Sequence, residues 1–428
     1  MELKPSYKRS EAGVVPQDWL DYAVGDLIEF EGGSQPDKSV FRSSWKPGYI
    51  RLIQIRDYKT DKYEIYVPTN LARRFCIEND IMIGRYGPPI FQILRGLSGA
   101  YNVALIKAIP GPEIDRSYAY YFLKQDKLFA FIEKLSQRSS GQTGVDLKEL
   151  RAYPLPLPPT KAEQEAIAEA LSDADALIES LAQLIAKKRQ IKQGAMQELL
   201  TGKKRLPGFS GSGNKNSEIG EIPREWRVVE IGEIANVKTG PFGSSLHEHD
   251  YVDDGTPIIT VEHLGERGVV HANLPMVSNE DRKRLSAYSL EEGDIVFSRV
   301  GSVDRNARIS NAEQGWLFSG RLLRLRRLQG SVDTHYLSYQ FHSEPFKQRV
   351  RTVAVGQTMA SLNTRILKNV LIALPSLPEQ TDIAAILADM DAEIAVLEEK
   401  LTKARQVKQG MMQELLTGRI RLGKTTPP

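Results

Sequence analysis

The segment KQGAMQELLTGKKRL at residues 192–206 returns as KQGMMQELLTGRIRL at residues 408–422, with 12 of 15 positions identical. The shift between the two copies is 408 − 192 = 216 residues. A second echo lies upstream, where SEAGVVPQDWLDYAVGDLIEF (10–30) returns as SEIGEIPREWRVVEIGEIANV (217–237). The chain therefore contains two copies of one long unit, whereas solenoids and propellers repeat every roughly 20–50 residues. We expect an internal pseudo-two-fold repeat.

A long amphipathic helix is predicted to lead into each copy of the quoted segment. Small or apolar residues alternate in steps of four and three, the spacing of a coiled-coil seam. The seam consists of Ile167, Leu171, Ala174, Ile178, Leu181 and Ile185 in the first unit, and Ile383, Leu387, Met390, Ile394, Leu397 and Leu401 in the second. Prolines in YPLPLPPTKAEQ (153–164) precede the first helix, and glycines 202 and 418 end the two helices. Each helix should run about 39 residues, or roughly 58 Å.

An apolar stripe of that length must be buried, and the nearest partner is the other copy of the same helix. The predicted fold class is α+β, with two mixed α/β domains joined by two long antiparallel helices that form a coiled-coil spacer. The alternative is that each helix packs only on its own domain. The predicted boundaries are 1–158 for the first mixed domain, 159–205 for the central helix, 206–216 for a linker, 217–376 for the second mixed domain, and 377–428 for the C-terminal helix and tail.

Composition excludes several classes of protein. Hydrophobic content of 41% and charged content of 26% are ordinary for a globular protein. The single cysteine, Cys76, rules out an intramolecular disulfide and a cysteine-cluster metal site, and it suits the reducing cytoplasm. The sequence shows neither a long apolar run nor the apolar core of a signal peptide near its start. Because the net charge is only +3, basic residues could bind nucleic acid only where they cluster.

Matched loops in the two units carry the candidates for nucleic-acid contact. GRYG (84–87) and SRVG (298–301) place an arginine at the same point of each unit, and Gly-Gln-Thr occurs at 141–143 and at 356–358. Small donors on a glycine turn can approach phosphate, while arginine and glutamine can pair with base edges. We expect matched residues to position the DNA backbone and unmatched ones to read bases, against the alternative of solvated surface charges. The candidates are Arg51, Arg56, Lys59, Arg85, Tyr86, Gln142, Thr143, His247, His263, Arg299, Arg305, Arg308, Gln357 and Thr358.

Three other motifs have simpler interpretations. RLLRLRRL (321–328) alternates as a strand, with leucines facing one way and Arg324 and Arg326 the other. LHEHD (246–250) is more typical of a polar loop than of a metal site, which needs three or four convergent ligands. KKRQIK (187–192) could touch DNA, but a solvated face or a surface for a partner subunit is the favoured interpretation.

These motifs together resemble the specificity subunits of type I restriction–modification systems, over nearly the whole chain. The resemblance rests on the two helix ends, on SEAGVVPQDW (10–19) and SEIGEIPREW (217–226), and on LPLPPTKAEQ (155–164) and LPSLPEQ (374–380). It implies two target recognition domains on a paired-helix spacer, each of which reads one half of an asymmetric, bipartite DNA site. Since the sequence starts directly in the first recognition domain, we expect the C-terminal helix to close the pseudo-symmetric ring.

The resemblance also implies partners and cofactors. Double-stranded DNA, two methyltransferase subunits and restriction or translocase subunits are the expected partners. The chain is expected to have no catalytic centre and no cofactor of its own, because S-adenosylmethionine, ATP and Mg²⁺ belong to the partner subunits. Because both half-sites must lie on one accessible face of the DNA, their centres should be about one DNA turn, roughly 10 bp, apart, and the paired helices would then act as a ruler. Two alternatives remain: a protein-interaction scaffold with no DNA role, and a fused restriction–methylation enzyme, which the absence of catalytic motifs disfavours.

Overall fold

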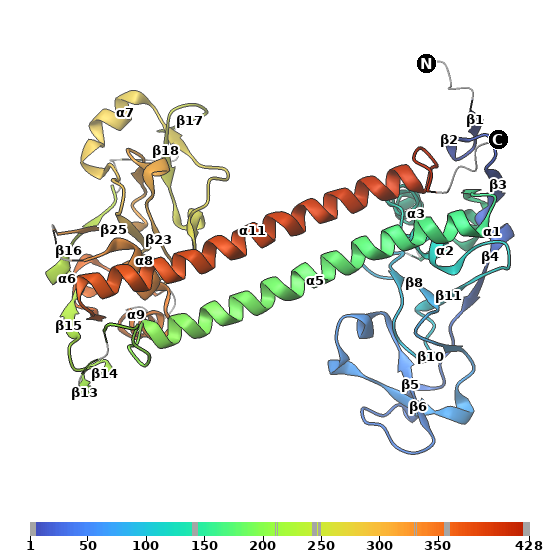
Figure 1. The fold of residues 1–428 in the computed structure, drawn as a ribbon, viewed down its shortest axis with the longest axis horizontal. Helices are drawn as coiled ribbons and strands as arrows, with labels where there is room; N and C mark the ends of the chain where they lie inside the picture. The colour runs from blue at the N-terminus through green and yellow to red at the C-terminus, as the bar shows by residue number, and fades with distance from the viewer. Residues whose placement is uncertain are drawn as a thin grey trace. The chain divides into compact units, whose positions relative to one another are not determined.

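The computed structural model describes residues 6–138, 144–209, 211, 213–241, 246, 250–328, 330, 332–354 and 360–422. It divides into two compact units (Figure 1). Unit 1 comprises residues 1–181 and 400–428, and unit 2 comprises residues 182–399. Each unit is therefore built from a mixed domain and from parts of both long helices.

The mixed domain of unit 1 contains two four-stranded sheets and two strand pairs. One sheet has the order β4 (Ile28–Gly32), β11 (Leu105–Pro110), β8 (Ile81–Gly84), β9 (Ile93–Leu94). The other has the order β6 (Tyr66–Pro68), β5 (Tyr49–Ile53), β10 (Gly99–Tyr101), β7 (Phe75–Cys76), in which β5 and β10 are parallel. The pairs are β1 (Tyr7–Ser10) with β2 (Gly13–Pro16), and β3 (Leu20–Ala23) with β12 (Pro154–Leu157). The helices are α1 (Val24–Leu27), α2 (Arg116–Leu123), α3 (Asp126–Arg138) and α4 (Leu147–Ala152), with 3₁₀ turns η1 (Lys38–Val40), η2 (Ile55–Tyr58), η3 (Asp61–Tyr63) and η4 (Thr69–Leu71).

Unit 2 repeats this plan. Its first sheet has the order β16 (Ala235–Thr239), β25 (Leu322–Arg327), β22 (Ile295–Ser298), β23 (Asn306–Arg308), and its second has the order β17 (Tyr251–Val252), β21 (Met276–Val277), β18 (Thr256–Ile259), β24 (Leu317–Phe318). The pairs are β13 (Asn214–Ser217) with β14 (Gly220–Pro223), β15 (Arg227–Glu230) with β26 (Leu371–Leu374), and β19 (Leu264–Gly265) with β20 (Gly268–Val269). The helices are α6 (Ile231–Ile234), α7 (Asn279–Arg284), α8 (Thr334–His342), α9 (Glu344–Val353) and α10 (Thr364–Lys368), with 3₁₀ turns η7 (Val261–His263), η8 (Ser286–Tyr288) and η9 (Asn311–Glu313). As in unit 1, one strand pair of the second sheet, here β18 with β24, is parallel.

The two long helices have the predicted length. Helix α5 (Lys161–Leu199) and helix α11 (Leu377–Leu415) each contain 39 residues. In unit 1 the start of α5 and the end of α11 share one hydrophobic core, which contains Ile167 and Leu415. In unit 2 the end of α5 and the start of α11 share another, which contains Leu199 and Ile383. The helix segments in each unit therefore run antiparallel, and the alternative in which each helix packs only on its own domain is wrong.

Ion pairs join the helix segments within each unit. Lys192 lies 2.6 Å from Asp391 and Lys188 lies 2.6 Å from Glu393 in unit 2. The equivalent of the first pair in unit 1 is Lys408, whose ammonium lies 2.5 Å from Asp175. Lys188 and Lys192 of the KKRQIK segment therefore pair with the other long helix, a role that the interpretations of this segment did not include.

Each helix end is locked onto the start of a mixed domain. Gly202 has φ +72°, and a Cβ there would lie 2.4 Å from Pro223. Just beyond it, Arg205 pairs with Glu379, whose carboxylate also accepts a hydrogen bond from the indole of Trp226. Only glycine tolerates both the positive φ and the close approach.

Unit 1 has the same lock, made by the C-terminal segment. Gly418 has φ +68°, a Cβ there would lie 2.5 Å from Pro16, and Arg421 pairs with Glu163 and Asp18. The end of α11 therefore closes onto the N-terminal mixed domain, as expected. The domain boundaries remain predictions; strand β13 begins at Asn214, inside the range predicted as linker.

Candidate nucleic-acid interface

The arginine of GRYG stands at the end of a buried strand in unit 1. All four residues of β8 are buried, and the main chain of Arg85 is fixed on both sides. Its amide donates to the carbonyl of Ala104 at 2.8 Å, and its carbonyl accepts from Val145 at 3.1 Å. The guanidinium lies 5.3 Å from the ring centroid of Tyr86, which is 40% exposed. A buried strand thus ends in a half-buried cation beside an exposed aromatic ring.

The arginine of SRVG occupies the same place in unit 2. Strand β22 is fully buried, the amide of Arg299 donates to Arg321 at 2.8 Å, and its carbonyl accepts from Leu362 at 2.8 Å. Its guanidinium also donates to the carbonyl of Gly320 at 3.4 Å. Val300 forms a bridge with Ser361. The two arginines are therefore equivalent in structure, although the residue that follows is an exposed tyrosine in one unit and a half-buried valine in the other.

The chain returns to these arginines directly after the predicted Gly-Gln-Thr loops. A Cβ at Gly144 would lie 3.1 Å from the ring of Tyr86, so glycine permits the close approach. In unit 2, Ala360 accepts a hydrogen bond from Gly301 at 2.9 Å. The motif residues themselves, Gln142, Thr143, Gln357 and Thr358, lie outside the described residues, as does His247.

A second predicted group in unit 1 lies beside the end of β8. Turn η2 packs there, because a Cβ on Gly84 would lie 3.3 Å from the side chain of Ile55. Arg56 and Lys59 are exposed on and just after this turn, and the guanidinium of Arg56 lies 5.3 Å from the ring centroid of Tyr63. The structure therefore brings the η2 residues next to the strand end that carries Arg85.

Arg51 has a different setting from its neighbours. It lies on β5, with its guanidinium 2.9 Å from Asp61 and 2.7 Å from Glu64. Burial opposes ionisation of Arg51, but these carboxylates outweigh burial and raise its pKa. A guanidinium that already donates to two carboxylates has fewer N–H groups left to donate to a base than an exposed, unpaired one.

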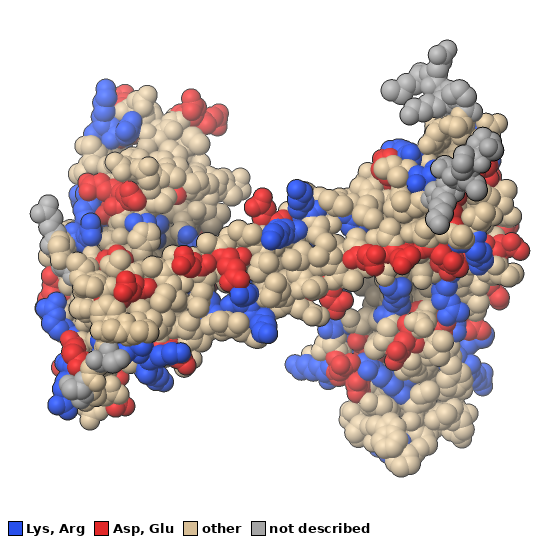
Figure 2. Space-filling model, viewed as in Figure 1, with Lys and Arg blue, Asp and Glu red and all other residues tan. Residues whose placement is uncertain are grey.

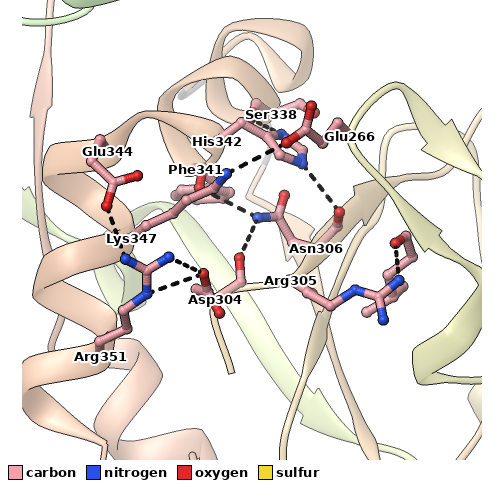
Figure 3. Close-up of polar contacts among 11 residues, drawn as sticks. Glu266, Asp304, Arg305, Asn306, Ser338, Phe341, His342, Glu344, Lys347 and Arg351 are labelled. Atoms are coloured by element: carbon pink, nitrogen blue, oxygen red, sulfur yellow. Dashed lines mark hydrogen bonds and ion pairs between the residues drawn. The ribbon is translucent and has the colours of Figure 1, made fainter. Parts of the chain in front are cut away.

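In unit 2, Arg305 fastens the loop after β22 to the η7–β19 segment (Figure 3). Its guanidinium donates to the carbonyl of Leu264 at 2.6 Å. The preceding residue, Asp304, pairs with Arg351 of α9 at 2.6 Å. The loop that follows Arg299 is thus held from two sides, and Arg305 orients it.

Two predicted base-reading residues are packed inside unit 2. His263 is only 2% exposed, and its Nδ1 accepts the amide hydrogen of Thr260 at 3.0 Å, so the imidazole caps turn η7. Arg308 donates to Thr334 Oγ1 at 3.1 Å, and burial lowers its pKa. These environments favour a structural role for both side chains.

The arginines of the predicted strand 321–328 are also structural. Leu323 and Leu325 are buried as predicted, but Arg324 is only 7% exposed and donates to the carbonyl of Ser289. Arg326 pairs with Asp294 at 2.7 Å. The predicted alternation is present, yet both faces of β25 are covered.

Sequence reasoning missed two aromatic residues on the surface of unit 1. Trp45 is 64% exposed and Tyr63 is 48% exposed, and the ammonium of Lys62 lies 5.3 Å from the Tyr63 ring centroid. Exposed rings beside cations are suited to stacking on bases. The sequence feature that could have identified Tyr63 is its position four residues after the candidate Lys59.

Charge on the visible face is mixed in sign, as the small net charge predicts (Figure 2). Along α5 in unit 1, acidic residues form a row, and Glu165, Glu169 and Asp173 are exposed there at four-residue intervals. Such a row repels a DNA backbone. Within the described ranges we find neither a group of three potential metal ligands nor a helix with the length and hydropathy that crossing a bilayer requires.

Comparison with known proteins identifies relatives along both units. The family model described as the type I restriction modification DNA specificity domain matches residues 16–189 and again residues 223–406. The MjaVIII specificity subunit of Methanocaldococcus jannaschii, from a type I restriction enzyme, is 26% identical over 422 residues, covering 97% of this chain and 96% of that protein. The EcoBI specificity subunit of Escherichia coli is 21% identical over 421 residues, covering 95% and 86%.

Solved structures share the fold. The S subunit of a type I restriction–modification system from M. genitalium superposes with a TM-score of 0.59 at 17% identity, covering 97% of this chain and 98% of that one. A chain from a study of complex assembly in the type I R-M system gives 0.56 at 16% identity, covering 95% and 99%. The predicted fold class, two mixed domains with long helices, is confirmed, and none of these findings supports a scaffold without a DNA role.

Proposed function

Because this chain belongs to the type I restriction modification DNA specificity family, we propose that its two mixed domains each read one half of a bipartite, asymmetric DNA site. The chain is a DNA-specificity subunit. In the proposal, residues 1–158 and 217–376 are the recognition domains, 206–216 is the linker, and residues 159–205 and 377–428 provide the helices between them. In the proposal, the two half-sites have different base sequences because the residue after the matched arginine differs between the domains, Tyr86 in one and Val300 in the other.

One observation carries this proposal: Arg85 and Arg299 stand at equivalent buried strand ends with equivalent main-chain bonds. Fixing the main chain of a reading residue fixes the point from which its side chain extends, so less of the residue has to be ordered on binding. The exposed Tyr86 beside one arginine, and the loop braced by Arg305 beside the other, then supply different surfaces to the two half-sites.

The partners and chemistry follow from membership in a restriction–modification family. We propose that the chain has no catalytic centre and docks two methyltransferase subunits together with restriction or translocase subunits. S-adenosylmethionine, ATP and Mg²⁺ would be bound by those subunits. Methylation needs the target base out of the stack, so the recognition domains would hold DNA while a partner flips it. A cytoplasmic location is part of the same proposal.

The test compares Arg85→Ala with Arg299→Ala in the assembled methyltransferase complex. Losing one arginine–base or arginine–phosphate contact should cost about 1–3 kcal/mol, or roughly 5- to 150-fold in affinity for the specific site. Each substitution should relax or weaken one half-site and leave the sequence requirement of the other unchanged. The measurement is DNA binding to a panel of sites that carry substitutions in one half.

The matched controls are Arg9→Ala and Arg227→Ala. Both arginines are exposed, lie on β1 and at the start of β15, and are not among the candidate interface residues. They should leave both half-sites unchanged. If Arg85→Ala and Arg299→Ala behave like these controls, or if each weakens both half-sites equally, the assignment of one half-site to each domain is wrong.

A further inference from the structure

Helices α8 and α9 of unit 2 differ in one respect from their counterparts α2 and α3 in unit 1. The register between them is clear, because Tyr118 and Tyr336 are both fully buried and donate to main-chain carbonyls at 3.1 and 3.2 Å. The shift is 336 − 118 = 218 residues. In that register, Phe122 corresponds to Gln340 and Phe131 corresponds to Arg349.

In unit 1 these positions complete an aromatic cluster. The ring centroid of Phe131 lies 5.2 Å from that of Tyr153, and the centroid of Phe122 lies 6.5 Å from it. Phe122 is only 2% exposed. The space between helices and strand is therefore filled by apolar side chains.

In unit 2 the same region holds a cavity of about 300 Å³, lined by Gln340, Arg349 and other residues of the unit. Gln340 is only 3% exposed, yet its Oε1 has no hydrogen-bond partner among the described residues. The buried Nε of Arg349 likewise has none. An unsatisfied buried polar group costs about 1–3 kcal/mol, so two of them around one cavity indicate a missing partner.

Arg349 also lacks a counter-charge. Among the described residues it forms no ion pair, whereas Arg351, two residues along the same helix, pairs with both Asp304 and Glu344. Burial lowers the pKa of Arg349 with no opposing carboxylate to raise it. The nearest ring is that of Phe346, 5.9 Å from its guanidinium.

We propose that this cavity binds the phosphate group of a small molecule, either free phosphate or a phosphate monoester. Arg349 donates to the phosphate oxygens, and Lys203 on the rim of the cavity adds a second positive charge. Gln340 Oε1 accepts a hydrogen bond from the phosphate hydroxyl. This site is independent of the DNA contacts proposed above, and among the described residues of unit 1 an aromatic cluster fills the corresponding space.

The acceptor on Gln340 distinguishes phosphate from other anions. A carboxylate at neutral pH, and sulfate at any physiological pH, carries no hydroxyl to donate. Inorganic phosphate keeps at least one, and a monoester keeps one below its second pKa of about 6. Leu200, Ile222 and Ala373 form part of the apolar lining, and the lining also includes Glu221, whose carboxylate accepts a hydrogen bond from Asn214 at 3.1 Å. The cavity volume exceeds the roughly 30 Å³ of one water several-fold, which leaves room for an ester group.

The experiment is calorimetric titration of the full-length chain at pH 6 and constant ionic strength. The probes are inorganic phosphate, glycerol 3-phosphate and sulfate. We expect saturable binding of at least one of the two phosphates, with sulfate at least roughly 10-fold weaker because it cannot donate to Gln340. Tighter binding of inorganic phosphate would identify free phosphate as the ligand, and tighter binding of glycerol 3-phosphate would identify a monoester.

Variants that copy residues of unit 1 into unit 2 test the site directly. Arg349→Phe and Gln340→Phe introduce the residues that unit 1 carries, and each should weaken phosphate binding by roughly 10- to 100-fold. Gln340→Glu is nearly isosteric and places a carboxylate in the cavity, so it should abolish binding without requiring a larger side chain to fit. Arg351→Met removes a charge from the same helix outside the cavity, and its affinity for phosphate should match that of the unaltered chain.

Three results would overturn the proposal. The first is the absence of phosphate binding at 10 mM, on the order of its concentration in a cell. The second is binding that Arg349→Phe and Gln340→Glu leave intact. The third is sulfate binding as tight as phosphate binding, which would remove the role of Gln340 and with it the assignment to phosphate.

Discussion

The ion pair between Arg205, which follows helix α5, and Glu379, in the first turn of helix α11, offers the sharpest test of how the long helices are attached to the mixed domain of unit 2. Arg205 Nε lies 2.5 Å from Glu379 Oε1, and its Nη2 lies 2.8 Å from Oε2. The Glu379 side chain is only 1% exposed, and its carboxylate also accepts a hydrogen bond from the indole of Trp226 at 3.2 Å. Replacing Arg205 with methionine would keep the bulk of the stem but remove the bidentate partner.

The expected cost follows from the burial of the carboxylate that is left behind. Breaking a buried ion pair by removing one partner costs about 3–5 kcal/mol, because a buried charge loses its compensation. Arg205 itself is 15% exposed, so solvent screens the pair slightly and the lower end, about 3 kcal/mol, applies. For a unit of roughly 200 residues, 1 kcal/mol corresponds to about 2–4 °C, which predicts a fall of about 6–12 °C in the Tm of unit 2.

The assay is thermal unfolding of the full-length chain, followed by near-UV circular dichroism. Arg224→Met is the matched control, since that arginine is exposed and forms no ion pair with any of the described residues; its Tm should change by less than 2 °C, on the order of an ordinary surface substitution. The double variant Arg205→Met/Glu379→Met should recover much of the loss, because no charge remains buried. A Tm for Arg205→Met within 2 °C of the unaltered chain, on the order of the control, would refute the reasoning.

Three further predictions concern single residues. In urea unfolding, Gly202→Ala should lower the free energy of unfolding by at least about 1 kcal/mol more than Gly208→Ala, because both glycines have positive φ but only Gly202 lies against a proline ring. Equal losses of stability in the two variants would contradict the close packing of Gly202. Burial raises the pKa of the Cys76 thiol to about 11, so its reaction with a thiol reagent at pH 8 should be at least roughly 100-fold slower in the folded chain than in urea, and fast labelling would show that the site opens. Burial also raises the pKa of Asp57, so its carboxyl group stabilises the fold at low pH and loses that contribution as the pH rises through its folded pKa. Asp57→Asn should therefore be more stable than the unaltered chain at pH 7 and lose this advantage below about pH 4. A larger stability advantage at pH 4 than at pH 7 would contradict the predicted direction of the pKa shift.

The helical part of the fold could be predicted because its signals are periodic and repeated. The seam from Ile167 to Ile185 specifies an apolar stripe, and the two glycines specify the helix ends. The pairing of Arg205 with Glu379 could not be predicted, because 174 residues separate them and neither belongs to a local pattern. The cores of the two units show the antiparallel arrangement expected from the repeat, with the start of one long helix packed beside the end of the other.

The candidate site was predictable where the two copies could be compared. Arg85 and Arg299 were found because the surrounding residues repeat, and their structural equivalence follows from the same strands. His263 aligns with a different residue, Asp57, in unit 1, so comparison of the two copies did not single it out, and no local pattern indicated the burial of Arg308. His263 is a cap because turn η7 needs an acceptor three residues beyond Thr260, a requirement that aspartate meets in the corresponding turn η2 at Asp57.

The central claim is that two different domains of one chain read two separated half-sites. The most direct measurement is a genome-wide map of methyladenine after this chain is expressed with its methyltransferase partner in a host that lacks DNA methylation. The account predicts one split motif with methylated adenine in both halves, whose centres lie about one helical turn, roughly 10 bp, apart. A single contiguous motif, or no methylation by a partner shown to be active, would contradict it.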